Sequence, residues 1–341
     1  MRRYSIVSLL LFGFIFFSIR NGSANTKAGA NAAQFLKIGI GARAAAMGGS
    51  FAALADDATT LYWNPAGAGW LRDKQFVFSY TESFAEINHG YAAAILPFSD
   101  ATTIGVSLTT LYAPEMEQTT VEFPGGTGVN FDARDVAIGL TYARRMTDRF
   151  SFGFTAKYVQ QTLFNESAET VAFDVGGLLH TDFRGMRIGM GMCNFGGKMS
   201  PDGRDLLISY DDQLTHSNPL TPGKLETQGW SLPMIFRLGL AVEAVGGERS
   251  FVPHEDQKLI VTIDGYHVND ADETLSFGLE YGWREMLFLR GGNRLNHDTE
   301  TFSLGFGIAL DLIRHKIRFD YSYSDMSDLG NLQRFGAGLL F

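Results

Sequence analysis

The chain has 341 residues, a formal net charge of −9 and 19% charged residues, against about 25% in an ordinary soluble domain. The acidic balance excludes the basic footprint that nucleic-acid binding requires. The single cysteine, Cys193, excludes an intramolecular disulfide and a four-thiolate metal site. Glycine (39 residues) and aromatic residues (13%) are abundant, while the mean hydropathy is −0.02. This combination is typical of alternating strands with one apolar face.

The first 24 residues have the three parts of a secretory signal peptide. Met1–Arg3 is basic, Tyr4–Ile19 is an apolar run, and small residues at Gly22 and Ala24 suit cleavage after Ala24. The apolar run is short for a membrane span, which needs about 20 residues, and an uncleaved anchor is the alternative. Residues 1–24 are therefore predicted to export the chain, as a periplasmic protein, a secreted protein or a bacterial outer-membrane barrel.

Residues 25–75 lack strand-like alternation. Asp56 or Asp57 is placed to cap a short helix, which would end before Pro65 because the residue preceding a proline avoids the α region. The stretch Gly39–Ala44 superficially matches a dinucleotide-binding fingerprint. No strand–helix–strand context follows it, so we reject that interpretation.

From Phe76 onward the sequence alternates with a period of two, which is the signature of β-strands. In one such stretch the apolar face comprises Phe302, Leu304, Phe306, Ile308, Leu310 and Leu312, and the other face comprises Ser303, Gly305, Gly307, Ala309 and Asp311. A soluble β-sandwich also alternates and is the alternative. The outer face of a sandwich is usually rich in Lys, Thr and Glu, whereas the non-apolar face here mixes glycine with charge.

About fourteen strands are predicted, and the connections between them alternate in length. The predicted spans are 76–83, 88–97, 102–112, 132–145, 150–162, 170–180, 186–195, 231–243, 257–265, 273–283, 286–295, 301–312, 316–324 and 333–341. Short turns fall at 98–101, 146–149, 182–185, 284–285 and 313–315, and the connection 244–256 is an exception on that side. The longest connection is 196–230, and 114–131 is also long. Short turns on one side and long loops on the other describe a bacterial outer-membrane barrel, with its periplasmic side at the short turns.

Aromatic residues near the strand ends support this architecture, since interfacial aromatics prefer the headgroup level. We expect Tyr80, Tyr91, Tyr112, Tyr158 and Tyr323 near the outer rim, and Tyr142, Phe150, Trp283 and Phe341 near the periplasmic rim. The last strand alternates and carries Phe335, Leu339 and the terminal Phe341 on one face. Such an ending resembles the signal recognised by the barrel assembly machinery.

A fourteen-stranded barrel has a lumen too wide for wall side chains alone to fill, so it is either plugged or a pore. Residues 25–75 are the candidate plug. Seven glycines predicted on the inner wall would let a plug approach closely: Gly105, Gly139, Gly153, Gly189, Gly239, Gly278 and Gly305. Because unpaired buried charge is costly, the lumen charges are expected to pair across the wall or to hold the plug, and an ion-selective lining is the alternative. These charges include Arg187, Arg237, Glu280, Arg290, Arg318 and Asp320.

The candidate plug carries motifs that resemble those of a known family. The stretches Leu36–Gly49, Leu54–Ala58 and Tyr62–Gly67 look like the start of the PorV/PorQ family. The Ala-Asp-Asp-Ala and Asn-Pro-Ala elements also keep the spacing seen in FadL-type long-chain fatty-acid channels. The plug-motif residues are Gly41, Arg43, Gly48, Gly49, Asp56, Asp57, Asn64, Pro65 and Ala66.

The resemblance implies a FadL-like barrel over residues 76–341, with an N-terminal plug over residues 25–75. It also implies a role beside the type IX secretion system, in which such barrels accept or shuttle secreted proteins. The expected partners are outer-membrane lipid, secreted cargo proteins or type IX secretion subunits, and the barrel assembly machinery. The alternatives are passive uptake of hydrophobic small molecules and a purely structural barrel.

The sequence contains no recognisable catalytic or cofactor-binding constellation. The seven histidines are scattered, with no pair at metal-ligand spacing on one strand: His89, His180, His216, His254, His267, His297 and His315. Carboxylate clusters at 254–256 and 269–273 could bind divalent cations, but solvated loops are the simpler interpretation. No serine lies in a Gly-x-Ser-x-Gly elbow. We therefore expect a non-enzymatic protein without a cofactor or a metal.

Overall fold

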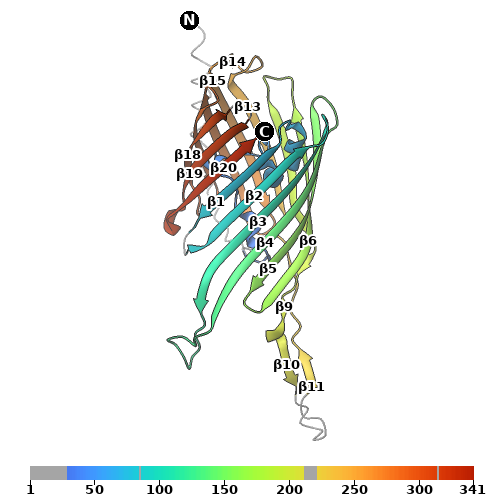
Figure 1. Ribbon diagram of the computed structural model, residues 1–341, viewed down its shortest axis with the longest axis vertical. Helices are drawn as coiled ribbons and strands as arrows, with labels where there is room; N and C mark the ends of the chain where they lie inside the picture. Colours follow the sequence, from blue (N-terminus) through green and yellow to red (C-terminus); the bar gives the residue numbers. More distant parts are fainter. Residues whose placement is uncertain (1–28, 84–85, 211–220, 313–314) are drawn as a thin grey trace.

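The computed structural model describes residues 29–83, 86–210, 221–312 and 315–341. Fourteen long antiparallel strands form one closed β-barrel (Figure 1). The predicted fold class, an all-β antiparallel barrel of about fourteen strands, is confirmed. The predicted signal peptide, residues 1–24, lies outside the described residues.

The barrel closes on itself through the pairing of its last strand with its first. The wall strands are β1 (Gln75–Glu82), β2 (Asn88–Pro97), β3 (Thr102–Glu117), β4 (Asn130–Arg145), β5 (Phe150–Leu163), β6 (Glu166–His180), β7 (Arg187–Gly196), β13 (Ile235–Gly246), β15 (Gln257–Val268), β16 (Ala271–Trp283), β17 (Leu287–Leu295), β18 (Phe302–Leu312), β19 (His315–Asp325) and β20 (Asn331–Leu340). Each pairs with the next, and β20 pairs with β1 from Gln75 opposite Leu340 to Glu82 opposite Gln333. Every wall strand thus has two neighbours, which is the condition for a sheet in lipid.

The strands differ most from their predicted spans at the long-loop end. β3 and β4 continue as a paired hairpin to Glu117 and Asn130, past an irregularity between Ala113 and Met116. The predicted loop 196–230 contains β8 (Lys198–Met199), β9 (Asp202–Gly203), the 3-10 helix η4 (Arg204–Leu206), β10 (Leu207–Tyr210), β11 (Thr221–Lys224) and β12 (Trp230–Ser231). Figure 1 shows β10 and β11, which pair with each other, projecting from the lower end of the barrel. Most residues of these extensions are exposed or half-buried on both faces, so they lack the alternation that reveals a wall strand.

The short turns lie at the opposite end of the barrel, at the top of Figure 1. The connection 244–256 contains β14 (Val252–Pro253), which pairs in parallel with the end of β13. Of the predicted turn 313–315, residues 313–314 lie outside the described residues. The connection from β19 to β20, at the long-loop end, contains the 3-10 helix η5 (Ser327–Leu329).

The side chains on the two faces of the wall follow the predicted alternation. On β18, Phe302, Leu304 and Phe306 are exposed on the outside, whereas Ser303 is buried inside. Most of the aromatic residues expected at the rims are exposed on the outer surface, including Tyr80, Tyr112, Tyr158, Tyr142, Phe150, Trp283 and Phe341. Tyr91 is the exception, because β2 turns Ala92 and Ala94 outward and buries Tyr91 and Ala93 within the barrel. The expectation of an interfacial Tyr91 was wrong.

The N-terminal segment, defined here as residues 29–74, contains four short helical turns. These are η1 (Gln34–Lys37), α2 (Ala42–Ala46), α3 (Thr60–Trp63) and η2 (Pro65–Trp70). α3 ends before Pro65 as expected, but neither Asp56 nor Asp57 is its N-cap. That position is Thr59, whose backbone N–H donates to the Asp57 carboxylate at 2.9 Å. Within the described ranges, no helix is long and apolar enough to cross a membrane.

Deleting Phe341 is expected to reduce assembly of the barrel. Phe341 exchanges two backbone hydrogen bonds with Lys74, at 3.0 and 3.1 Å, and so extends the β20–β1 closure by one pair. The fraction of outer-membrane protein that migrates in the heat-modifiable form on unboiled gels measures assembly. Phe123→Ala, at an exposed loop position, is the control and should leave this fraction unchanged. Equal assembly of the truncated chain would show that Phe341 is no assembly signal.

Candidate functional site: the N-terminal segment against the inner wall

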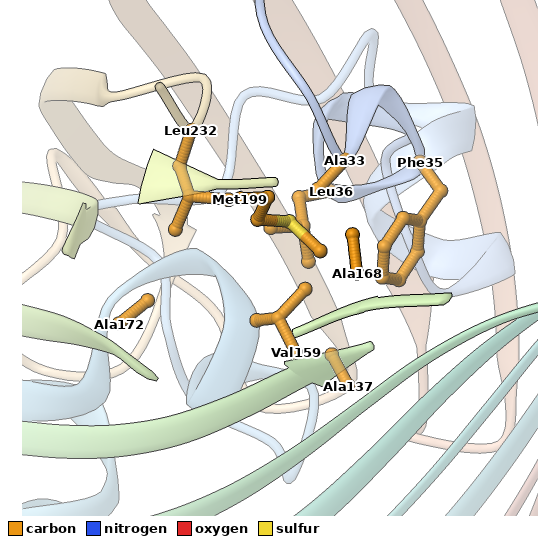
Figure 2. Close-up of a cluster of buried hydrophobic side chains, with 9 residues drawn as sticks. All are labelled: Ala33, Phe35, Leu36, Ala137, Val159, Ala168, Ala172, Met199 and Leu232. Carbon is orange, nitrogen blue, oxygen red and sulfur yellow. The ribbon is translucent and has the colours of Figure 1, made fainter. Parts of the chain in front are cut away.

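The N-terminal segment packs against the inner wall at several places around the ring. Met47, Phe51 and Leu54 form a buried cluster with Ala241 of β13 and Ile260 of β15. A second cluster, shown in Figure 2, joins Ala33, Phe35 and Leu36 of the segment to Ala137, Val159, Ala168 and Ala172 of β4, β5 and β6, and to Met199 and Leu232. α2 contacts β18 and β19, whereas η2 contacts β4 and β5 elsewhere in the ring. The segment therefore bridges separate parts of the wall across the lumen.

Glycines on the inner wall allow this close approach. A Cβ added at six of the seven predicted glycines would stand 3.0 Å or less from an atom of the N-terminal segment: Gly105, Gly153, Gly189, Gly239, Gly278 and Gly305. The seventh, Gly139, faces wall side chains of Ser107, Thr155 and Lys157 instead. At Gly153 and Gly189 the clashing atoms belong to the backbone of the segment. Side chains at those positions would therefore force the two backbones apart.

The Asn64-Pro65-Ala66 motif fastens the segment to β5 and β6. The Asn64 amide donates to the carbonyl of Ala52 at 2.8 Å and to that of Gly177 at 3.2 Å. Its oxygen accepts from the backbone N–H of Ala66 at 3.2 Å and so caps η2, which has Pro65 in its first turn. The Ser151 hydroxyl then donates to the Ala66 carbonyl at 2.7 Å. One buried asparagine thus links two parts of the segment to the wall.

The motif glycines lie where the backbone has positive φ. Gly41, Gly48 and Gly49 have φ values of 81°, 66° and 77°, a region that residues with a Cβ rarely adopt. The Gly48 N–H donates to the Ser303 hydroxyl at 3.1 Å, and its carbonyl accepts from Arg294 at 3.2 Å. These turns let α2 end against β17 and β18.

Arg43 is the centre of the charged contacts between the segment and the wall. Its guanidinium makes two parallel bonds of 2.7 Å to Glu280 of β16 and also pairs with Asp56 and with Asp57. Arg43 and Glu280 are 8% and 3% exposed. Burial opposes the charge on Arg43, yet Asp56 and Glu280 hold its pKa well above the ordinary value. Burial likewise opposes ionisation of Asp56, but the Arg43 charge keeps the pKa of Asp56 below its ordinary value.

The wall carries the second half of this network. Arg290 pairs with Glu280 at 2.6 Å and with Asp320 at 2.8 Å. Arg318 pairs with Asp320 at 3.0 Å, and Arg187 lies 3.7 Å from Asp56. The connected set has four guanidinium groups (Arg43, Arg187, Arg290 and Arg318) and four carboxylates (Asp56, Asp57, Glu280 and Asp320). Its formal charges therefore balance, as burial of ions requires.

Several residues of this site were not singled out from the sequence. The Asp264 carboxylate accepts from the Ser50 hydroxyl at 3.0 Å and from the Ala52 N–H at 2.7 Å. Arg294 and Ser303 hold Gly48, as described above. Alternation places all three side chains on the inner face, as it did for Ser303 in the sequence analysis, but it does not reveal their contacts with the segment. The predicted terminal residues Phe335 and Phe341 are exposed on the outer surface and do not join this site.

A cavity of about 260 Å³ lies beside the segment, towards the short-turn end. Its lining includes Arg43, Asp56, Asp57, Glu280, Arg318 and Asp320, together with Val77 and Leu340. The lining thus combines charged side chains with apolar residues, including Phe76, Phe78 and Phe288. Among the described residues, no group of three or more His, Cys, Asp or Glu side chains is arranged to hold a metal ion.

The fold and the sequence place the protein in a known class. A closed fourteen-stranded barrel with an apolar outer face is the architecture of a membrane-spanning β-barrel. A family model described as "Type IX secretion system protein PorV" matches residues 21–203, which is more than half of the chain. The chain therefore belongs to the PorV family. No curated protein matches it.

Solved structures share the fold at low sequence identity. The CymD monoaromatic hydrocarbon channel is 12% identical, covers 89% of this chain and 96% of its own, and has a TM-score of 0.59. The Pseudomonas putida toluene transporter TodX is 13% identical, with coverages of 89% and 97% and a TM-score of 0.56. A Pseudomonas aeruginosa FadL homologue is 12% identical, with coverages of 88% and 96% and a TM-score of 0.51. These likenesses concern the fold alone.

Arg43→Met is expected to loosen the N-terminal segment. Removing one partner of a buried ion pair costs about 3–5 kcal/mol, and we expect the lower end because Glu280 retains Arg290. On unboiled gels the folded barrel migrates faster than the heat-unfolded chain. The midpoint temperature at which heating converts the fast-migrating form into the slow-migrating form should fall. Arg149→Met is the control, because its pair with Asp182 is 60% and 67% exposed and such pairs contribute little. Equal midpoints for the two variants would contradict a role of Arg43 in holding the segment.

Gly153→Ala is expected to displace the segment from β5. The new Cβ would stand 2.3 Å from the carbonyl carbon of Pro65 and 2.4 Å from the nitrogen of Ala66. Gly338→Ala is the matched control, because the atoms nearest to its Cβ would be 3.8 and 3.9 Å away. Limited proteolysis of the detergent-solubilised protein should cleave the segment several-fold faster in Gly153→Ala only. Equal cleavage rates would mean that close packing at Gly153 does not hold the segment.

Proposed function

We propose that this protein is a non-enzymatic outer-membrane barrel that works with the type IX secretion system by binding secreted proteins or other secretion subunits. Membership of the PorV family is the observation that carries this proposal. In this proposal residues 1–24 are a cleaved signal peptide, and the barrel assembly machinery inserts the mature chain.

The long-loop end supplies the binding surface in this proposal. The tip between β3 and β4 exposes Val121 fully and Phe123 to 59%. The projection beyond β9 exposes Leu207 and Ile208. Apolar side chains on extended loops indicate contact with another protein. These loops extend beyond the lipid-facing wall at the end opposite the short turns (Figure 1).

We further propose that the N-terminal segment is a plug that keeps the lumen closed while the loops bind their partner. The Arg43 network and the packing of Asn64-Pro65-Ala66 support this role, since each links the segment to the wall through buried contacts. Protein binding at the loops requires no path through the barrel. A fixed plug is therefore compatible with the proposed function.

Passive uptake of hydrophobic small molecules is the second candidate, because CymD and TodX are named as a hydrocarbon channel and a toluene transporter. The cavity beside the segment would offer such a molecule a mixed lining, with apolar residues such as Phe288 and Leu340 beside charged ones. A hydrocarbon there would contact Arg43, Asp56, Glu280 and Arg318, and would desolvate charged groups without offering them hydrogen bonds. The charged groups of this lining therefore weigh against a hydrocarbon ligand, and its apolar residues are compatible with one.

The loop-tip double variant Val121→Asp with Phe123→Asp is expected to lose bound protein partners. The tagged protein would be purified from its own outer membrane in mild detergent, and co-purifying proteins would be identified by mass spectrometry. Co-purified secreted proteins or secretion subunits should fall at least several-fold in the variant. Phe183→Asp, an equally exposed change at the short-turn end, should retain them. A preparation that carries only fatty acid or other apolar ligand would contradict the secretion role and support uptake.

A further inference from the structure

The outer wall has a recess where the barrel closes. The strands β18, β19, β20 and β1 lie side by side (Figure 1), and their outward side chains stand in cross-strand rows. One row comprises Phe306, Tyr321, Phe335 and Tyr80, and the next comprises Ile308, Phe319, Ala337 and Phe78. Ala337 is the only small side chain in these two rows. The outer surface is therefore recessed at Ala337, between the rings of Phe319 and Phe78.

An apolar groove of about 340 Å³ occupies this recess. Ala337 and Gly336 lie at its base, and the side chains around it include Phe78, Phe319 and Phe335. These three rings are each about half-exposed on the lipid-facing side of the wall. Sites for small ligands usually have volumes of about 300–1,000 Å³. The recess is thus large enough to hold part of a ligand.

The row above the recess forms a fixed boundary of the groove. The centroid of the Tyr321 ring lies 5.5 Å from that of Phe306 and 5.3 Å from that of Phe335. The Tyr321 hydroxyl donates to the side-chain oxygen of Gln333 at 3.1 Å. Contacts on both sides and at its far end hold the Tyr321 ring in the row. It therefore does not turn into the groove and fill it.

A cation lies on the same outer face at the short-turn rim. Lys74 exchanges two backbone hydrogen bonds with Phe341, so the alternation of β1 continues to Lys74 and puts its side chain on the face of Phe76 and Phe78. Lys74 is exposed, and it forms no ion pair within the described part of the chain. The exposed His315 lies beside it, with its ring 6.1 Å from that of Phe341. This rim complements the charge of an anionic group.

The spacing between the cation and the groove fits a membrane lipid. Lys74 and Phe78 are four residues apart on β1, which is about 13 Å at about 3.3 Å per residue. One leaflet contributes about 15 Å to the hydrocarbon core. An acyl chain whose phosphate lies at Lys74 therefore reaches the groove without leaving its own leaflet.

We propose that a glycerophospholipid binds across the closure, with one acyl chain in the Ala337 groove and its phosphate at Lys74. The apolar outer face of the wall is covered by lipid, so the occupant of an apolar recess there is an acyl chain. The bound lipid contacts both strands of the closure, β20 through Ala337 and β1 through Phe78 and Lys74, and so stabilises their pairing. The inference depends on the membrane-spanning barrel and is independent of the secretion role.

The test measures lipid binding to the purified barrel in mild detergent. After removal of endogenous lipid, native mass spectrometry would measure the binding of the first molecule of dioleoyl phosphatidylglycerol. Ala337→Phe fills the recess and should weaken this binding roughly ten-fold, since contacts with only a few methylene groups need be lost. Leu304→Phe, a change at an exposed position of β18 outside the groove, is the control and should bind as the wild type does. Equal binding by the two variants, or a series of equivalent lipids without a preferred first one, would mean annular lipid only and would overturn the proposal.

Two further measurements examine the headgroup and the position of the chain. Lys74→Met should weaken binding of the first lipid several-fold, whereas Lys198→Met, at an exposed position near the long-loop end, should not. Equal binding by these two variants would show that Lys74 does not hold the phosphate. A phospholipid with a photoreactive diazirine in its acyl chain should label peptides of β1, β19 and β20 in vesicles that contain the wild-type protein. Even labelling around the wall would overturn the proposal, and this outcome is informative even if Ala337→Phe fails to assemble.

Discussion

Closure of the sheet between β20 and β1 is the constraint on which the rest of this structure depends. Each unpaired backbone N–H or C=O costs several kcal/mol in hydrocarbon, so a lipid-exposed sheet cannot keep an edge. With fourteen strands, closure creates a lumen that the wall side chains cannot fill. The glycines and charges of the inner wall and the motifs of residues 29–74 follow from this geometry. The inner wall and residues 29–74 are the two complementary surfaces of one buried interface.

That interface uses charge to fix its geometry. Replacing a buried ion pair by apolar groups is often neutral or stabilising, so the four positive and four negative groups around Arg43 are weak evidence for stability as such. They do define one seating of the segment, because Arg43 must meet Glu280 of β16 while Asn64 meets Gly177 of β6. A slip of the segment would leave ions unpaired on both surfaces. The network therefore acts chiefly to fix the position of the N-terminal segment on the inner wall.

The wall was predictable from the sequence because its determinants are local. A period of two, set by burial on one side and lipid on the other, is visible within ten residues, as in Phe302–Leu312. The inner contacts were not predictable at this level, because many of them join residues far apart in the chain, such as Arg43 with Glu280, which are 237 positions apart. Alternation predicts that the side chains of Asp264, Arg294 and Arg237 face inward, but it does not predict which residues they contact. For the same reason Tyr91 was misplaced, since β2 has small residues on its lipid face and an aromatic residue inside.

The two candidate functions make different demands on the lumen and on the loops. Uptake requires a path for a solute beside the segment, which the Arg43–Glu280 pair fastens to the wall. Binding of a protein at Val121, Phe123 and Leu207 leaves that pair intact, because these residues lie outside the barrel wall. A barrel selected for protein binding can thus retain a tightly held segment and expose apolar loops.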